Sequence, residues 1–408
     1  MSAAAAHRRA MGAPDDLVRC PLMPTYGAPR VQFVRGEGSW LWDREGKRYL
    51  DLLSGLAVTS LGHAHPAVAT AVAEQAATLL HVSNLFGTEH NAPVALALDR
   101  LLGGGGQVFF ANSGAEANEC ALKLARKWAG GPQGTYTVVS AYGSFHGRTL
   151  ATLHATGQPA KHEPFQPLPA GFRHVAWADV GALDAALDGS VAAVLLEAVQ
   201  GEGGVNPAPD GYLREVRDLC TERGVLLMLD EVQTGLGRCG AWFAHQRAGI
   251  RPDVVTMAKA LGNGVPIGAC WARAEVAAAF EPGDHATTYG GQPLATAAAR
   301  AVLSVMEHED VPARAERAGA RLTAGLLDLP GVTAVRGWGL LLAAELSVPA
   351  GPVAADLLDH GVVVNAVTGS ALRLAPSLLI ADDEIDHAVD AVGAAIDRAV
   401  AAVDGGGE

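Results

Sequence analysis

The sequence has little charge and few aromatic residues, and it lacks long hydrophobic runs. Only 18% of its 408 residues are charged and 5% are aromatic. Lys and Arg number 30 against 43 Asp and Glu, which gives a formal net charge of −13 without any long basic run. Such a chain offers little to a phosphate backbone, so we expect no nucleic-acid partner. The apolar runs are far shorter than a bilayer-spanning segment, so we also expect no membrane partner.

Cysteine is scarce as well. The five cysteines are widely spaced and form no Cys-x-x-Cys motif, which predicts reduced thiols and a cytoplasmic protein. Residues 1–14 lack acids, but no apolar segment follows them, so we predict no secretion or transit signal. The hydrophobic content of 49% excludes general disorder and leaves room for two or three domains.

Helical and strand-like patterns alternate between residues 66 and 259. Apolar or β-rich runs predict strands at 107–110, 135–139, 191–196, 225–229 and 254–257, and amphipathic patterns predict helices at 66–81, 115–128 and 212–223. This repetition of strand, helix and strand predicts an α/β fold with a large, mostly parallel sheet and right-handed crossovers.

The pattern changes after Pro293. A long alanine-rich helix leads to short strands near 332–335, 340–346 and 362–367, and a last amphipathic helix carries acids at its N-terminus. We therefore predict a smaller α+β domain at 296–408, a large α/β domain at 61–295, and an N-terminal segment, 1–60, that packs with the small domain. The glycine tail at 405–407 is expected to be disordered.

Polar residues follow the predicted strands, at the edge where an open α/β sheet usually binds its ligand. They are Asn112-Ser113-Gly114, Phe145-His146-Gly147-Arg148, Glu197, Asp230 and Lys259. Each alone has an ordinary structural explanation, such as a turn cap or a solvated lysine. Together, a lysine, an acid, an aromatic ring and a glycine-containing helix start fit one cofactor, pyridoxal 5′-phosphate.

The chemistry of this cofactor gives each group a task. Lys259 would supply the amine for a Schiff base, and Asp230 would keep the pyridine nitrogen protonated so that the ring accepts electrons. The phosphate would bind backbone N–H groups at a helix start, in Ser113-Gly114-Ala115. Phe145 would cover one face of the ring.

Three motifs resemble the signature of class-III pyridoxal-phosphate aminotransferases. They are Asn-Ser-Gly-Ala-Glu-Ala at 112–117, Leu-Asp-Glu-Val-Gln-Thr-Gly-Leu-Gly-Arg at 229–238 and Thr-Tyr-Gly-Gly-Gln-Pro at 288–293. The resemblance extends from Tyr26 to about Glu384, and the segments 34–38, 61–66, 83–85 and 145–149 look most like the bacterial acetylornithine subgroup. It implies the fold-type I architecture and transfer of the distal amine of an acylated ornithine to 2-oxoglutarate, in arginine biosynthesis.

The resemblance also implies cofactor roles, residue by residue. It identifies Lys259 as the Schiff-base lysine and Asp230 as the partner of the pyridine nitrogen. It implies that Val232 lies against the ring opposite Phe145 and that Gln233 reaches the phenolic oxygen. Gly114 and Ala115 are expected to bind phosphate. Thr288 is expected to bind the phosphate of a neighbouring subunit, which implies a homodimer with shared active sites.

For the substrates, the implied residues are fewer. Arg148 and Thr287 resemble positions that contact the acylated ornithine. Arg373 looks like the arginine that binds the α-carboxylate of glutamate, and Glu202 resembles the acid that masks it. Tyr26 is expected to line the same pocket.

Two other readings of the sequence are weaker. Residues 235–240 formally satisfy the dinucleotide motif Gly-x-Gly-x-x-Gly, but they do not start at a strand end or open a helix, as that motif must. His63-x-His65 lacks a third ligand at a metal-binding spacing, so we expect no metal. The amine donor stays open among acetylornithine, succinylornithine, ornithine and succinyl-diaminopimelate, because small pocket changes decide between them.

Overall fold

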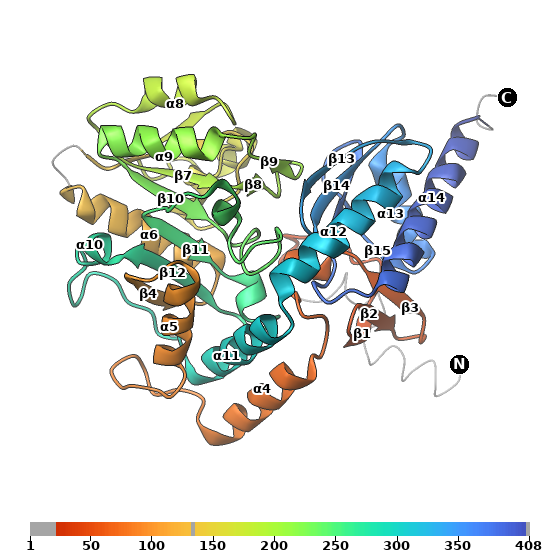
Figure 1. Cartoon of the computed structure of the whole chain (residues 1–408), viewed down its shortest axis with the longest axis horizontal. Helices are drawn as coiled ribbons and strands as arrows, with labels where there is room; N and C mark the ends of the chain where they lie inside the picture. Colours follow the sequence, from red (N-terminus) through yellow and green to blue (C-terminus); the bar gives the residue numbers. More distant parts are fainter. Residues whose placement is uncertain (1–21, 132–134, 405–408) are drawn as a thin grey trace.

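The computed structural model describes residues 22–131 and 135–404. The predictions for residues 1–14, for Cys20 and for the glycine tail at 405–407 concern parts of the chain outside these ranges. Figure 1 shows two units side by side, with the large sheet and its helices in one and the C-terminal strands and helices in the other. None of the described helices is both long and apolar enough to cross a membrane.

The larger unit is built on a seven-stranded sheet in the order β4-β12-β11-β10-β7-β5-β6. Pairing is parallel from β11 through β10, β7 and β5 to β6, whereas β12 runs antiparallel to both of its neighbours. The predicted mostly parallel sheet is therefore confirmed. The strands are β4 (Gly106–Ala111), β5 (Thr137–Ala141), β6 (Phe172–Val175), β7 (Val191–Glu197), β10 (Leu226–Asp230), β11 (Val254–Met257) and β12 (Gly268–Arg273).

Both faces of this sheet are covered, which explains why its strands read as continuous apolar runs. Along β10, Leu226 and Met228 face α6 (Gly114–Trp128), whereas Leu227 and Leu229 face the helices of the other side. That other side is covered by α8 (Val180–Ala186), α9 (Tyr212–Arg223), α5 (Asn91–Leu101) and α11 (Pro293–His308). Residues at alternate positions of one strand therefore belong to different cores.

The smaller unit is an antiparallel sheet with helices on it. Its strands β13 (Val332–Trp338), β14 (Leu341–Leu346), β17 (Ala371–Leu374) and β16 (Asn365–Ala366) pair in that order. Three helices belong to it, α12 (Val311–Leu327), α13 (Ala350–Asp359) and α14 (Asp382–Asp404). The first strands of the chain, β1 (Phe33–Glu37), β2 (Trp40–Asp43) and β3 (Arg48–Asp51), join this region because β3 pairs with β15 (Val362–Val363).

Short elements complete the described chain. The helices are α3 (Ser54–Ala57), α4 (Pro66–Thr78), α7 (Leu150–Ala155), α10 (Ala274–Ala277), and the 3-10 helices η2 (Pro159–Lys161), η3 (Glu163–Phe165), η4 (Ala244–Ala248) and η5 (Lys259–Leu261). A small hairpin pairs β8 (Val199–Gln200) with β9 (Asn206–Pro207).

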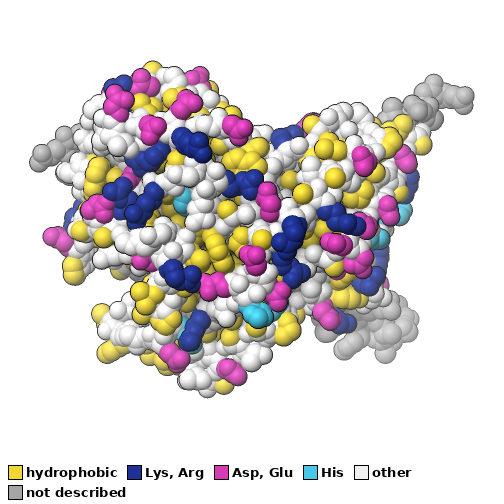
Figure 2. All heavy atoms as spheres, viewed as in Figure 1, with side chains coloured by type: hydrophobic (Ala, Val, Ile, Leu, Met, Phe, Trp, Pro, Cys, Tyr) yellow, Lys and Arg dark blue, Asp and Glu magenta, His cyan; other side chains and the backbone are white. Residues whose placement is uncertain are grey.

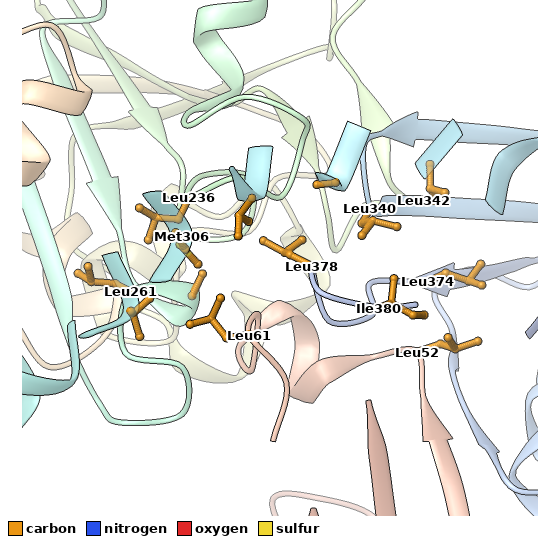
Figure 3. Close-up of a cluster of buried hydrophobic side chains, with 14 of the residues drawn as sticks. Leu52, Leu61, Leu236, Leu261, Met306, Leu340, Leu342, Leu374, Leu378 and Ile380 are labelled. Atoms are coloured by element: carbon orange, nitrogen blue, oxygen red, sulfur yellow. The ribbon is translucent and has the colours of Figure 1, made fainter. Parts of the chain in front are cut away.

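One continuous apolar cluster joins the two units. Figure 3 shows Leu261 and Met306 of the larger unit, Leu340 and Leu374 of the smaller one, and Leu378 between them. Burial of each such side chain contributes about 1.5–3 kcal/mol, so separating the units would be costly. The shared core fixes the distance between residues that the two units bring to one site.

Arg238 adds a polar connection at the same place. Its guanidinium is buried and donates hydrogen bonds to the carbonyl oxygens of Leu340 (3.1 Å) and Pro376 (2.6 Å) and to Ser60 Oγ (3.2 Å). Burial lowers the pKa of Arg238 to about 10. The segment that follows β10 is thereby tied to the β13–β14 turn and to the chain after β17.

Candidate active site

A cavity of about 380 Å³ opens at the carboxyl ends of β7, β10 and β11. This is the edge at which the sequence predicts a ligand site. Ten of the predicted residues line the cavity: Ser113, Gly114, Ala115, Phe145, Arg148, Glu202, Asp230, Val232, Gln233 and Lys259.

Asp230 is the centre of a buried hydrogen-bond network on the floor of the cavity. Its carboxylate accepts hydrogen bonds from Asn118 Nδ2 (2.8 Å) and the backbone N–H of Val232 (3.0 Å), and it lies 2.8 Å from His146 Nδ1. Thr256 Oγ1 donates to Asn118 Oδ1 at 2.6 Å, which fixes the amide that contacts Asp230. The carboxylate is therefore held in one orientation before any ligand arrives.

The sheet register explains why these groups meet. Asp230 pairs directly with Glu197 on β7 and with Thr256 on β11. All three side chains share the sheet face of Met228, which is the face that α6 covers and on which Asn118 lies. A row of polar groups across neighbouring strands thus ends an otherwise apolar layer.

Glu197 is the second buried acid of this row. It accepts hydrogen bonds from the backbone N–H groups of Phe145 (3.0 Å) and Gly201 (3.3 Å). Burial, and then the neighbouring charge of Asp230, raise the pKa of Glu197 well above its usual range. Glu197 therefore holds the Phe145 and Gly201 segments in place at the floor of the cavity.

The start of α6 forms another side of the cavity. Ser113 caps the helix by accepting a hydrogen bond from the N–H of Glu116, and the first N–H groups of a helix have no acceptor within it. A Cβ on Gly114 would lie 2.8 Å from both methyl groups of Val232, so only glycine allows this close packing. The N–H groups and the helix dipole favour an anion here.

Lys259 lies just after β11, at the first position of η5. Its φ of +40° is in the left-handed region, which a non-glycine residue adopts at a cost and which often marks a functional site. Burial lowers the pKa of Lys259 to about 8, and the charge of Glu202 partly opposes this effect. A much larger fraction of this amine is neutral near pH 8 than of an exposed lysine.

Two further side chains give the cavity its shape. Val232 and Phe145 both line it, together with Gln233. The side-chain oxygen of Gln233 and Nε2 of His146 are buried without a hydrogen-bond partner among the described residues. Unsatisfied buried polar atoms are uncommon in folded proteins and favour a polar ligand at this site.

Arg373 comes from β17 of the smaller unit and reaches the edge of the cavity. Its guanidinium is 2% exposed and forms an ion pair with Glu202, a hydrogen bond with the carbonyl oxygen of Gly201 (3.2 Å) and another with Asn365 Oδ1 (3.1 Å). Burial acts to raise the pKa of Glu202, but the charge and hydrogen bond of Arg373 outweigh it and lower that pKa.

The remaining predicted residues do not line the cavity of this chain. Tyr26 is 91% exposed and Thr288 is exposed. Thr287 lies one layer away, where its Oγ1 accepts hydrogen bonds from the N–H of Gly290 (3.0 Å) and from Asn112 Nδ2 (3.4 Å), and Asn112 lines the cavity. The expected roles of Tyr26, Thr287 and Thr288 stay predictions.

Sequence reasoning assigned no role to Asn118, His146, Glu197 or Thr256, although the structure places all four around Asp230. His146 and Glu197 do belong to the polar residues named at the ends of the predicted strands, but that position gave neither of them a task. Asn118 and Thr256 gave no comparable signal, because a single polar residue inside a helix or an apolar strand is common.

His63 and His65 lie in ordinary structural positions. His63 Nε2 lies 2.7 Å from Asp51 Oδ2, and His65 immediately precedes α4. Across residues 22–131 and 135–404, no group of three or more His, Cys, Asp or Glu residues could hold a metal ion. The segment 235–240 forms turns and opens no helix, unlike a dinucleotide-binding motif.

On the side of the molecule that Figure 2 presents, the surface has no large patch of charge of one sign. Lys and Arg side chains are interspersed there with Asp and Glu.

Comparison with known proteins gives a consistent result. The model of the class-III aminotransferase family matches residues 24–396. The chain is 46% identical to acetylornithine aminotransferase of Methanothermobacter thermautotrophicus, over 93% of this chain and 97% of that protein. It is 49% identical to acetylornithine aminotransferase of Mycobacterium tuberculosis H37Rv, over 93% of this chain and 95% of that protein.

Solved structures agree with the fold. Ornithine aminotransferase of Toxoplasma gondii matches with a TM-score of 0.90 at 34% identity, over 97% of this chain and 98% of that one. N-acetylornithine aminotransferase of Stenotrophomonas maltophilia matches with a TM-score of 0.79 at 38% identity, over 92% and 98%. With a fold-type I architecture and a lysine, an acid and a helix start around one cavity, the chain belongs to the class-III aminotransferases, which are pyridoxal-phosphate enzymes.

Proposed function

We propose that this aminotransferase moves the distal amine of N-acetylornithine to 2-oxoglutarate, giving N-acetylglutamate semialdehyde and glutamate. The names of the relatives at 46–49% identity support this substrate pair. The proposal places the enzyme in arginine biosynthesis in the cytoplasm. The observation that carries it is the ion pair between Glu202 and Arg373 at the edge of the cavity.

The residues on the cavity floor fit pyridoxal 5′-phosphate. Gly114 and Ala115 would bind its phosphate through backbone N–H groups, and Asp230 would hold a proton on its ring nitrogen. Val232 and Phe145 would cover the two faces of the ring, and Gln233, which also lines the cavity, would contact its phenolic oxygen. When bound, the cofactor supplies an electron sink for the carbanion formed at the substrate carbon.

Lys259 would perform the proton transfer at that carbon. Its lowered pKa leaves the amine partly neutral near pH 8, so that it can accept a proton and return it. Asp230 would stay in place because Asn118, Val232 and His146 hold its oxygens.

Glu202 and Arg373 would let one pocket accept two substrates. Glutamate and 2-oxoglutarate bring an α-carboxylate close to the reacting carbon, and Arg373 would bind it after Glu202 moves away. N-acetylornithine brings no carboxylate to that position, so Glu202 would keep the buried arginine paired. Arg148 would bind the carboxylate at the far end of either substrate, with Thr287 beside it.

A panel of amine donors tests the substrate. N-acetylornithine, succinylornithine, ornithine and succinyl-diaminopimelate are each assayed with 2-oxoglutarate, and glutamate formation is measured. We expect the highest kcat/KM for N-acetylornithine. A higher value for another donor would reassign the substrate within the same class.

We further propose a homodimer in which Thr288 binds the phosphate of the partner's cofactor. Large exposed hydrophobic side chains near Thr288 support this proposal, namely Leu80, Leu85, Phe86 and Tyr289. The ring of Tyr289 lies 5.5 Å from that of His81, and Asn84 Nδ2 donates to the carbonyl oxygens of Thr287 and Gly290 at 3.1 Å. The segment that carries Leu80, Leu85 and Phe86 therefore lies beside the turn that carries Thr288.

Subunit mixing tests the shared site. Lys259→Ala and Thr288→Ala variants are purified separately, and each is expected to have little activity. After the subunits are exchanged, one of the two sites in a mixed dimer is intact, so activity should return. An active monomer, or no recovery in demonstrated mixed dimers, would contradict the proposal.

A further inference from the structure

A second cation lies beside the ring that lines the cavity. Lys161, the last residue of η2, places its Nζ 5.7 Å from the centre of the Phe145 ring. The guanidinium carbon of Arg148 lies 5.3 Å from the same centre. Phe145 and Arg148 both line the cavity, so Lys161 lies next to the cavity wall that Arg148 helps to form.

Lys161 is held in this position by defined contacts. Its ammonium donates a hydrogen bond to Gln158 Oε1, and Gln158 Nε2 donates to the carbonyl oxygen of Ser144 at 2.9 Å. Ser144 Oγ in turn accepts a hydrogen bond from the N–H of Gly157 at 3.0 Å. Since Ser144 precedes Phe145 directly, the ammonium is fixed to the backbone that carries the ring.

Neither of the two cations has a counter-ion among the described residues. Within residues 22–131 and 135–404, no carboxylate oxygen lies within 4.0 Å of the charged nitrogens of Lys161 or Arg148. Burial, followed by the charge of Arg148, lowers the pKa of Lys161, and the charge of Glu202 opposes this. Glu202 itself is paired with Arg373.

Like charges that share a partly buried wall repel each other, and an anion between them removes that cost. The hydrogen bond to Gln158 uses only one of the three ammonium donors, which leaves two for a ligand. The far carboxylate of the substrate is the anion that the proposed reaction brings to this wall.

We propose that Lys161 is a substrate-binding residue that shares the far carboxylate of both substrates with Arg148. This inference rests on the proposed function for the identity of the substrates. It adds a second cationic contact for the α-carboxylate of N-acetylornithine and for the γ-carboxylate of 2-oxoglutarate. Lys161 therefore favours donors that are anionic at the end remote from the reacting amine.

Three variants of the holoenzyme test this inference. Lys161→Met removes the charge, Lys161→Arg keeps it, and Lys123→Met is the matched control, because Lys123 is an exposed lysine bonded to the carbonyl oxygen of Asp284. The first measurement is the Kd of glutarate, a dicarboxylate without the reacting group, from the change in cofactor absorbance. Loss of one charge-assisted contact should weaken binding by about tenfold in Lys161→Met. Lys161→Arg and Lys123→Met should bind as the unaltered enzyme does.

The second measurement compares N-acetylornithine with N-acetylputrescine, which is the same amine without the carboxylate. Lys161→Met should raise KM about tenfold for N-acetylornithine, with little change in kcat, and should leave KM for N-acetylputrescine unchanged. An unchanged glutarate Kd, or an equal loss for both amines, would overturn the inference. If N-acetylornithine proves not to be a substrate while glutarate binding still weakens tenfold, the proposed substrate fails and the anion contact of Lys161 stands.

Discussion

The floor of the active site and its substrate edge are built in different ways. On the floor, Asp230 has three polar neighbours within 3.0 Å, and they come from α6 and from the segments after β5 and β10 of one unit. At the edge, Arg373 of one unit is paired with Glu202 of the other, and Glu202 keeps 31% of its side chain exposed. The floor has the fixed contacts that a permanent cofactor requires, and the edge has contacts that a substrate can replace.

Backbone geometry explains the difference. The floor residues occupy one register level of neighbouring strands, so their spacing is set by the sheet itself. Glu202 lies in a turn after β8, and Arg148 is exposed between β5 and α7. Side chains on such segments reorient at lower cost than those inside a sheet.

Removing the amine of Lys259 from the floor should have the largest effect on turnover. Lys259→Ala removes the amine that transfers the proton, so turnover should fall by roughly 10²–10⁴-fold from lost proton transfer alone. The cofactor should still bind through the groups around Asp230 and Gly114. Stopped assays measure turnover, and equilibrium dialysis measures the cofactor. Near-native turnover would remove Lys259 from the mechanism.

Removing the charge of Asp230 from the floor should have the second-largest effect on turnover. Asp230→Asn keeps the size of the side chain but removes the charge that holds the ring proton, so kcat should fall on the order of 10²–10³-fold. Asp253→Asn is the matched control, because Asp253 is also buried and paired, with Arg217 and Arg273, but does not line the cavity. It should lower the midpoint of thermal unfolding and leave kcat almost unchanged. Similar kcat losses in both variants would contradict a special role for Asp230.

Breaking the edge should affect only one half of the reaction. Arg373→Met should slow the 2-oxoglutarate half by roughly 10- to 100-fold through loss of a charge-assisted hydrogen bond. The N-acetylornithine half should change by less than about threefold. Single-turnover measurements of each half separate the two effects. Equal slowing of both halves would show that Arg373 does not act as assigned.

The smallest expected effect is a shift in the pKa of Lys259, which a titration measures directly. In the protein without cofactor, labelling of the amine by acetic anhydride should rise with pH and reach half of its maximum near pH 8, because burial lowers the pKa to that value. An exposed lysine would titrate about two units higher. Glu202→Gln should move the midpoint down and Arg373→Met should move it up, since the charge of Glu202 raises this pKa and that of Arg373 lowers it. Mass spectrometry of the labelled peptide measures the midpoint, and opposite shifts would contradict the coupling between floor and edge.

Local patterns predicted most of the large sheet. The run at Val191–Glu197 and the helix ended by Gly224 appear where the sequence places them, because apolar runs and glycine caps act locally. The strand β12 was missed, since only the short 3-10 helix η5 separates Gly268–Arg273 from β11, which breaks the pattern of parallel strands joined by long helices. It pairs with β11 just before it and with β4, which lies more than 150 residues away in the chain.

The sequence by itself determined the family, the cofactor and the residues at the ends of strands, because each is carried by a short motif whose chemistry can be read directly. Only the tertiary structure decided which groups surround them. Asn118 reaches Asp230, and Thr256 fixes Asn118, because the register aligns three strands beneath one helix. Arg373 meets Glu202 because the two units pack around one shared core. Lys161 lies beside Phe145 because hydrogen bonds through Gln158 hold it to the backbone of Ser144. Such meetings depend on the packing of whole units, and no local pattern of residues specifies them.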